Sequence, residues 1–179
     1  MEFNGINHLA LVCRDMEETV RFYRDVLGMP LIKTVALPDG GQHFFFDCGG
    51  GNCVAFFWWP ETAGAAPGVA APKRPLDMSD LRSAIGSMNH VAFHVAEDKL
   101  DAYCAHLQSL GIDIFPYVVN HDDSEQGYSP TMHPGVFIRS VYFMDPNGIL
   151  LEFAANTREL TPEDVRHQPK SAVRPLETV

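Results

Sequence analysis

The amino-acid sequence predicts an α+β fold made of two tandem βαβββ modules that together form one domain over residues 1–179. The first observation is a repeat, in which the segment INHLAL at 6–11 returns as MNHVAF at 88–93. The second is that each copy is followed by apolar residues at helical spacing that end at a glycine. The third is that three strand-like runs follow each glycine, which gives strand, helix and three strands per module.

Module one is expected over residues 5–59. Its first strand alternates, so His8 and Ala10 share one face of the predicted sheet. Asp15 is placed to cap a helix, and Gly28 ends that helix. The apolar stripe of the helix consists of Met16, Val20, Tyr23 and Leu27. The three strands that follow are expected at 31–37, 42–47 and 52–58.

A linker is expected over residues 60–87, because this stretch is rich in proline, alanine and glycine. Module two is expected over 88–157, with a helix that ends at Gly111. The apolar stripe of this helix consists of Leu100, Tyr103, Leu107 and Leu110. The remaining strands are expected at 112–119, 136–143 and 149–155. Residues 158–179 are expected to form a tail that begins with a short helix capped by Thr161.

The composition limits the partners and the location of the protein. With 46% hydrophobic and 20% charged residues, the chain can bury a core. The net charge of −10 argues against a nucleic-acid partner, which requires a basic surface. No membrane partner is expected, because no apolar run approaches the roughly 18 residues of a membrane span and the N-terminus lacks the basic residues of a signal peptide. The four cysteines form no C-x-x-C pair, so we expect reduced thiols in a cytoplasmic protein.

A tandem βαβββ repeat of this kind resembles the vicinal oxygen chelate superfamily, which includes glyoxalase I, bleomycin-resistance proteins and the type I extradiol dioxygenases. The resemblance covers about residues 5–157. It implies that the modules curl into a cup-shaped mixed β-sheet and that a metal ion lies between their first and last strands. It also implies a homodimer, because members of the superfamily often form dimers.

The expected metal ligands are His8, His90 and Glu152. The histidines occupy equivalent places in the two repeats, and Glu152 is a carboxylate in an otherwise apolar strand, where it needs a cationic partner. Two histidines and one carboxylate leave coordination positions open and suit Fe(II), although Mn(II) could use the same ligands. When the last strands of the two modules are aligned, Ala55 matches Glu152, and the resemblance places the fourth ligand of glyoxalase-like isomerases there. Alanine cannot bind a metal, so the site is expected to have three protein ligands.

The stretch 131–152 has every fixed position of a pattern associated with type I extradiol dioxygenases. Those positions are Thr131, His133, Val141, Tyr142, Asp145, Pro146, Gly148 and Glu152. A good hairpin turn would explain the residues from Asp145 to Gly148, so the specific content is His133 and Tyr142. The resemblance implies that Tyr142 hydrogen-bonds a substrate oxygen at the metal and that His133 contacts the substrate or oxygen.

One feature of the extradiol enzymes is missing, namely an acid–base histidine on the last strand of module one. His43 or His94 could take that role. Further side chains are expected near the pocket: Phe45, Phe57, His121 and Tyr128. The two aromatic residues of module one would suit a flat ring, and the other two lie in a long connection of module two that is typical of a binding loop. Each of these residues also has a plain structural explanation, as a core aromatic or a solvated loop residue.

The leading hypothesis is a metal-dependent extradiol-type dioxygenase with Fe(II) as the expected metal. Its substrates would be O₂ and a catechol, hydroquinone or similar small chelating aromatic. A glyoxalase-like isomerase or lyase is one alternative, which Ala55 and the Tyr142–His133 pair oppose and the missing histidine supports. A non-catalytic binding protein of the bleomycin-resistance kind is the other, which the complete ligand set opposes.

Overall fold

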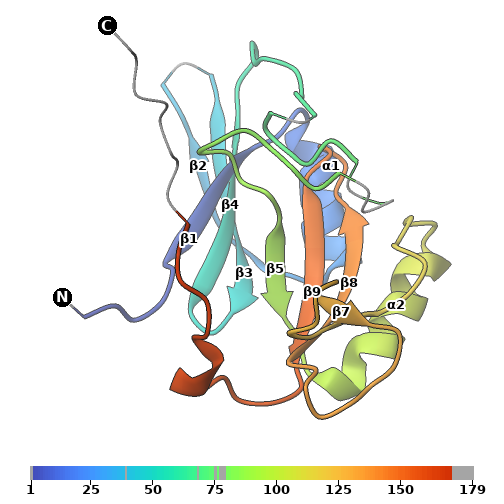
Figure 1. Ribbon diagram of the computed structural model, residues 1–179. Helices are drawn as coiled ribbons and strands as arrows, with labels where there is room; N and C mark the ends of the chain where they lie inside the picture. The colour runs from blue at the N-terminus through green and yellow to red at the C-terminus, as the bar shows by residue number, and fades with distance from the viewer. Residues whose placement is uncertain (1, 39, 68, 75, 77–79, 171–179) are drawn as a thin grey trace, which may run out of the picture.

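The computed structural model describes residues 2–38, 40–67, 69–74, 76 and 80–170, and in this part the chain forms two mixed β-sheets, one for each module (Figure 1). The first sheet contains β1 (His8–Val12), β4 (Asn52–Trp58), β3 (Gln42–Gly49) and β2 (Leu31–Ala36), in that order. The second contains β5 (Val91–His94), β9 (Leu150–Asn156), β8 (Ile138–Met144), β6 (Val119–His121) and β7 (Tyr128–Ser129). The expected α+β architecture of two related modules is confirmed.

The helices begin and end where the sequence predicts. Asp15 caps α1 (Met16–Val20) by accepting a hydrogen bond from the backbone N–H of Glu18 at 2.9 Å, and the helix continues as the π-helical segment η1 (Arg21–Val26). In module two, the 3₁₀ turn η2 (Glu97–Lys99) leads into α2 (Leu100–Ser109). Gly28 and Gly111 follow the two helices with φ values of 72° and 74°, a left-handed conformation that glycine adopts without strain.

The strand predicted at 112–119 is wrong in its position. Ile114 forms a single bridge to Phe143, and a regular strand, β6, begins only at Val119. Pro116 lies between them and has no N–H to donate, so the apolar run cannot pair continuously. The long connection that follows is partly ordered as the short β6–β7 hairpin.

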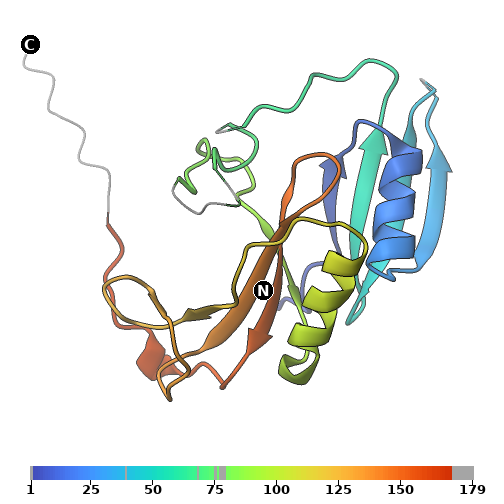
Figure 2. The ribbon, with the colours of Figure 1, turned by 90° about the vertical axis from the view of Figure 1, so that its right-hand side faces the viewer.

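The two modules share one hydrophobic core. Both helices lie on the same side of the molecule, with α1 (blue) across the first sheet and α2 (yellow-green) beside the second, as Figure 2 shows. Polar contacts also cross between the modules, because the Tyr23 hydroxyl donates to the buried carboxylate of Asp145 at 3.2 Å and His106 Nε2 lies 3.2 Å from the Val26 carbonyl oxygen. The modules are therefore fixed relative to one another.

The helix-free faces of the sheets carry the polar side chains of interest. Along β1, Leu9 and Leu11 pack on the core, whereas His8 points to the opposite, exposed face. Along β9, Phe153 is in the core and Glu152 is on the opposite face. Strand alternation thus directs the predicted ligands away from the helices.

The tail begins with η3 (Pro162–Asp164), which has the capping box predicted at Thr161. Residues 68, 75 and 77–79 of the predicted linker and 171–179 of the predicted tail lie outside the described part of the chain. All four cysteines are free thiols. No helix among the described residues is long and apolar enough to cross a membrane.

Candidate metal centre

Strand register makes Glu152 and Ala55 equivalent. Glu152 pairs with Ala92 of β5 on one side and Tyr142 of β8 on the other. Ala55 pairs in the same way with Ala10 of β1 and Phe45 of β3. The register supports the repeat alignment made from sequence, and it leaves a methyl group in module one where module two has a carboxylate.

The carboxylate of Glu152 is buried and paired. Its side chain is 6% exposed, and its Oε2 lies 2.9 Å from Nε2 of His90. Ser140, itself fully buried, donates its hydroxyl hydrogen to Oε1. Burial alone would raise the pKa of Glu152, but the bonds from His90 and Ser140 outweigh it and lower that pKa. Glu152 is therefore an anion whose oxygens face the His90 imidazole and the Ser140 hydroxyl.

Both predicted histidine ligands are oriented by the asparagine that precedes them. Nδ1 of His8 lies 2.8 Å from the side-chain oxygen of Asn7, and Nδ1 of His90 lies 2.8 Å from that of Asn89. An Nδ1 that donates to an amide oxygen leaves Nε2 as the metal-binding nitrogen, which is how outer hydrogen bonds orient metal ligands. The donor set of His8, His90 and Glu152 thus fits a divalent cation chemically.

Aromatic side chains surround His8 on the first sheet. Its ring centroid is 5.5 Å from that of Phe45 and 6.4 Å from that of His43. His43 stacks on Phe57 at 3.6 Å, and Phe57 stacks on Trp59 at 5.0 Å. Burial, followed by the nearby His8, lowers the pKa of His43. The predicted residues of module one therefore form an aromatic wall beside His8.

One chain does not bring all three predicted ligands together. Within the described residues, no three His, Cys, Asp or Glu side chains are close enough to share one metal ion. His90 and Glu152 are adjacent on the second sheet, and His8 lies on the first.

Tyr142 borders the His90–Glu152 pair. Its ring is 5% exposed and stands edge-on to His90, with the centroids 5.9 Å apart. Its hydroxyl oxygen lies 3.2 Å from Nε2 of His121. Burial, followed by the negative charge of Glu152, raises the pKa of Tyr142, so the phenol stays protonated. The two residues from the predicted pocket, Tyr142 and His121, are in contact.

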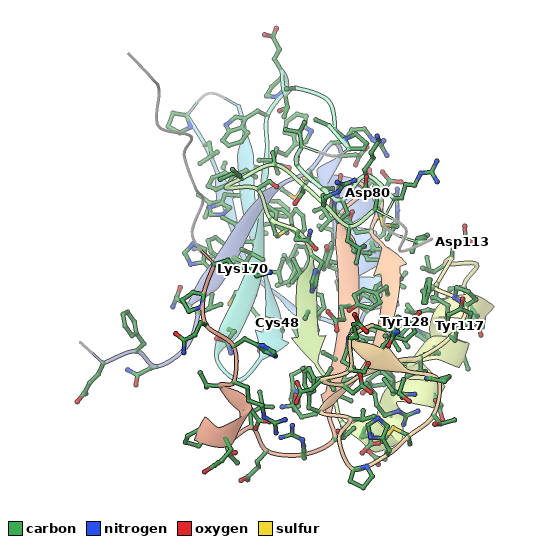
Figure 3. The ribbon with its side chains drawn as sticks, viewed as in Figure 1. Cys48, Asp80, Asp113, Tyr117, Tyr128 and Lys170 are labelled. Carbon is green, nitrogen blue, oxygen red and sulfur yellow. The ribbon has the colours of Figure 1, made fainter. Side chains whose placement is uncertain are left out.

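The other predicted residues lie further from the His90–Glu152 pair. Nε2 of His133 is 2.9 Å from the Asp122 carboxylate and Nδ1 accepts from the Gly135 N–H, at the wall of a cavity of about 490 Å³ beside the tail. His94 ends β5 and lines a cavity of about 630 Å³ between the modules. Tyr128 is 55% exposed on β7, where Figure 3 labels it.

Sequence reasoning did not identify Asn7, Asn89 and Ser140 as site residues. The dipeptide Asn-His occurs in both copies of the repeat, which was a usable signal. Ser140 shares strand parity with Tyr142, but a serine in a strand carries no signal of its own.

Comparison with known proteins is consistent with this architecture. A family model for the Glyoxalase/Bleomycin resistance protein/Dioxygenase superfamily matches residues 5–153. The metallothiol transferase FosB of Shouchella clausii (strain KSM-K16) is 28% identical over 170 residues, which cover 94% of this chain and 90% of FosB. A putative ring-cleaving dioxygenase, MhqE of Bacillus subtilis (strain 168), is 44% identical over only 48 residues, which cover 26% of this chain and 16% of MhqE.

A solved structure shares the fold. It is a mutant of the fosfomycin resistance protein FosX from Listeria monocytogenes, complexed with Mn(II) and 1S,2S-dihydroxypropylphosphonic acid. The TM-score is 0.56 with 18% identity, and the match covers 87% of this chain and 93% of that one. At this identity, the likeness concerns the fold alone.

Proposed function

The chain belongs to the Glyoxalase/Bleomycin resistance protein/Dioxygenase superfamily, and we propose that it is a metal-dependent extradiol-type dioxygenase acting on a small chelating aromatic such as a catechol or hydroquinone. The observation that carries the proposal is the buried Glu152 carboxylate beside His90, with the Tyr142 phenol at the same place. An anion and an oriented imidazole form part of a cation site, and the phenol can position a substrate oxygen there.

His8, His90 and Glu152 would hold the ion, with Fe(II) as our first choice and Mn(II) as the second. A divalent ion there supplies positive charge that favours the deprotonated form of a chelating hydroxyl group. The protein would contribute the rest: Tyr142 positions the substrate oxygen, and the aromatic side chains exclude water from the ring. A phosphonate ligand would need cationic side chains around it. The described contacts of His8 are instead with aromatic rings and with an amide, and these surroundings favour a flat aromatic substrate.

We propose further that His8 comes from a second copy of the chain, so that the enzyme is a homodimer. Within one chain, His8 could reach the His90–Glu152 pair only if the two modules moved relative to one another. Their shared core and the Tyr23–Asp145 contact oppose such movement. A second copy can approach without disturbing that core. The β1 strand has an open edge, and its exposed face carries Val12, which is 46% exposed.

The test of the proposed function is metal analysis combined with oxygen uptake. The purified protein is loaded anaerobically with Fe(II) or Mn(II) and then given catechol, hydroquinone and substituted derivatives. Oxygen consumption that depends on both metal and substrate, with a ring-opened product, is the expected result. Tight metal binding without oxygen uptake on any of these substrates would contradict the dioxygenase proposal.

A second candidate is a metal-dependent transferase that adds a thiol to a small electrophile, and the match to FosB over 94% of the chain favours it. The same metal-loaded protein is therefore assayed with fosfomycin and small thiols. Adduct formation in place of oxygen uptake would select this candidate. Isomerisation of a thiol adduct, the glyoxalase-like alternative, is distinguished by including a hemithioacetal substrate.

Replacing Tyr142 by phenylalanine should keep the metal and reduce turnover by about 100-fold, the scale typical of losing a group that acts on the reacting atoms. Tyr142 is not one of the three predicted ligands, and phenylalanine keeps the buried ring that packs with Phe115, Val119 and Leu150, so metal content should stay at the wild-type level. Tyr117→Phe is the matched control, because Tyr117 is 66% exposed and is not among the predicted site residues, and it should keep full turnover. Undiminished turnover in Tyr142→Phe would remove the phenol from the mechanism.

Replacing Asn89 by alanine should weaken metal binding by about 10- to 100-fold, because the His90 ring loses the partner that fixes its orientation. Asn7→Ala should have a similar effect through His8, since the two contacts are equivalent. The measurement is metal affinity from competition with a chelator of known affinity. If both variants bind metal as tightly as the wild type, the asparagines do not orient metal ligands.

A further inference from the structure

The two oxygens of the Glu152 carboxylate face different groups. Oε2 lies 2.9 Å from Nε2 of His90, the nitrogen that the Asn89 contact leaves for a metal ion. Oε1 instead accepts the hydroxyl hydrogen of Ser140. The direction of this second bond follows from chemistry, because a carboxylate that binds a metal ion is deprotonated and can only accept. One oxygen of Glu152 is therefore directed toward the ion, and the other is bonded to the protein.

The strands hold the Ser140 hydroxyl beside Oε1. Glu152 pairs with Tyr142 across the β8–β9 ladder, and Ser140 lies two residues before Tyr142 on β8. The serine side chain is thus on the same face as that of Glu152 and diagonal to it. Both strands are interior strands of the second sheet. Ser140 is fully buried and Glu152 is 5% exposed, so water has little access to replace the hydroxyl group.

The bond from Ser140 affects how many positions of a bound ion stay open. An octahedral ion has six positions, and two histidines with one carboxylate oxygen fill three of them. The three that remain accommodate both oxygens of a chelating ring and O₂. Carboxylates can also bind a cation through both oxygens. Glu152 would then fill a fourth position, and one place would be lost to the substrate or to O₂.

We propose that Ser140 is a positioning residue that keeps Glu152 a one-oxygen ligand and thereby reserves a coordination position for substrate or O₂. This inference rests on the proposed function, because the need for three open positions comes from a chelating substrate that binds together with O₂. The role differs from that of Asn89, which orients a ligand and supports metal affinity. Loss of the Ser140 hydroxyl frees Oε1 for the ion, which is then held as tightly as before but has less room for other ligands.

The first arm of the test counts water molecules on the ion and needs no substrate. Mn(II) is bound to the wild type, to Ser140→Ala and to Ser140→Thr, which keeps a hydroxyl group, and water-proton relaxation gives the number of exchangeable waters. We expect three waters in the wild type and in Ser140→Thr, and one fewer in Ser140→Ala. An unchanged number in Ser140→Ala would overturn the inference. Fewer than three waters in the wild type would also overturn it, and this result decides the matter even if neither variant folds.

The second arm separates this role from a merely structural one. Metal affinity is measured by competition with a chelator, and 4-nitrocatechol is titrated anaerobically into the Mn(II)-loaded proteins. We expect Ser140→Ala to keep metal affinity within about threefold of the wild type, unlike Asn89→Ala, and to bind 4-nitrocatechol about tenfold more weakly. A loss of metal affinity of about 10- to 100-fold with unchanged 4-nitrocatechol binding would contradict the proposal, because Ser140 would then only support the ligand.

The matched control is Ser109→Ala, which removes an exposed serine hydroxyl near the end of α2 that donates to the His106 carbonyl oxygen. This variant should match the wild type in water number, metal affinity and 4-nitrocatechol binding.

The two proposals fail in different ways. If Mn(II) carries the expected waters but 4-nitrocatechol does not bind the loaded wild type, the proposed function fails and the role of Ser140 at the metal stands. If the wild type consumes oxygen with catechol but Ser140→Ala keeps the wild-type water number, the proposed function stands and the role of Ser140 is wrong.

Discussion

Replacing Glu152 by alanine is expected to abolish metal retention, with a loss of affinity greater than the about 100-fold typical of outer hydrogen-bond partners. Glu152 is the one anion among the three predicted ligands, and it is buried where its charge acts strongly on a cation. Without it, His90 keeps its orientation through Asn89 but has no carboxylate to share an ion with. The measurement is metal content after dialysis against a weak chelator.

The matched control for this variant is Glu163→Ala, which removes a carboxylate from the exposed turn η3. It should retain metal at the wild-type level. Thermal unfolding of the metal-free proteins checks that Glu152→Ala is folded. Metal retained at full stoichiometry in a folded Glu152→Ala protein would show that the ion binds elsewhere.

Replacing Asp145 by alanine is expected to lower the free energy of unfolding by about 3 kcal/mol, because several buried donors lose an acceptor at once. Asp145 is 5% exposed and accepts from the backbone N–H groups of Asn147 and Ile149, both at 2.8 Å, and from the Tyr23 hydroxyl. It thus closes the β8–β9 hairpin and joins it to the helix of module one. Burial, as the largest influence, raises the pKa of Asp145, and these bonds offset part of that rise.

The control is Asp145→Asn, which keeps one side-chain oxygen for the backbone donors and should lose about 1 kcal/mol. Chemical denaturation of the metal-free proteins measures both variants. Equal stability of Asp145→Ala and the wild type would mean that the contact between the modules through Tyr23 contributes little. The fixed arrangement of the two modules would then depend mainly on their shared hydrophobic core.

The repeat allowed much of the fold to be predicted from sequence. Strand alternation placed His8 and Glu152 away from the helix-packed faces, and the alignment of Ala55 with Glu152 agrees with their register. These features are local or follow from duplicated local patterns. The misplaced strand at 112–119 shows where local patterns fail, because one proline interrupts pairing in an otherwise apolar run.

The contact between His121 and Tyr142 could not be derived in the same way. It depends on the pairing of β6 with β8, which is set by a long connection without a repeat counterpart. The sequence pattern singled out His133, but the orientation of its ring depends on Asp122, which is not part of that pattern. The separation of His8 from His90 is likewise a matter of how the modules pack, which no periodicity in the sequence encodes.

The most direct test of the shared metal centre is subunit complementation. His8→Ala and Glu152→Ala proteins are purified, mixed under conditions that exchange subunits, and analysed for bound metal. If His8 reaches the His90–Glu152 pair of the other copy, each variant alone holds no metal, while the mixture regains about a quarter of the wild-type sites, because half of the dimers are hybrids with one intact site. No metal in a mixture shown to contain hybrid dimers, alongside a wild type that binds it, would contradict a site completed by the second copy.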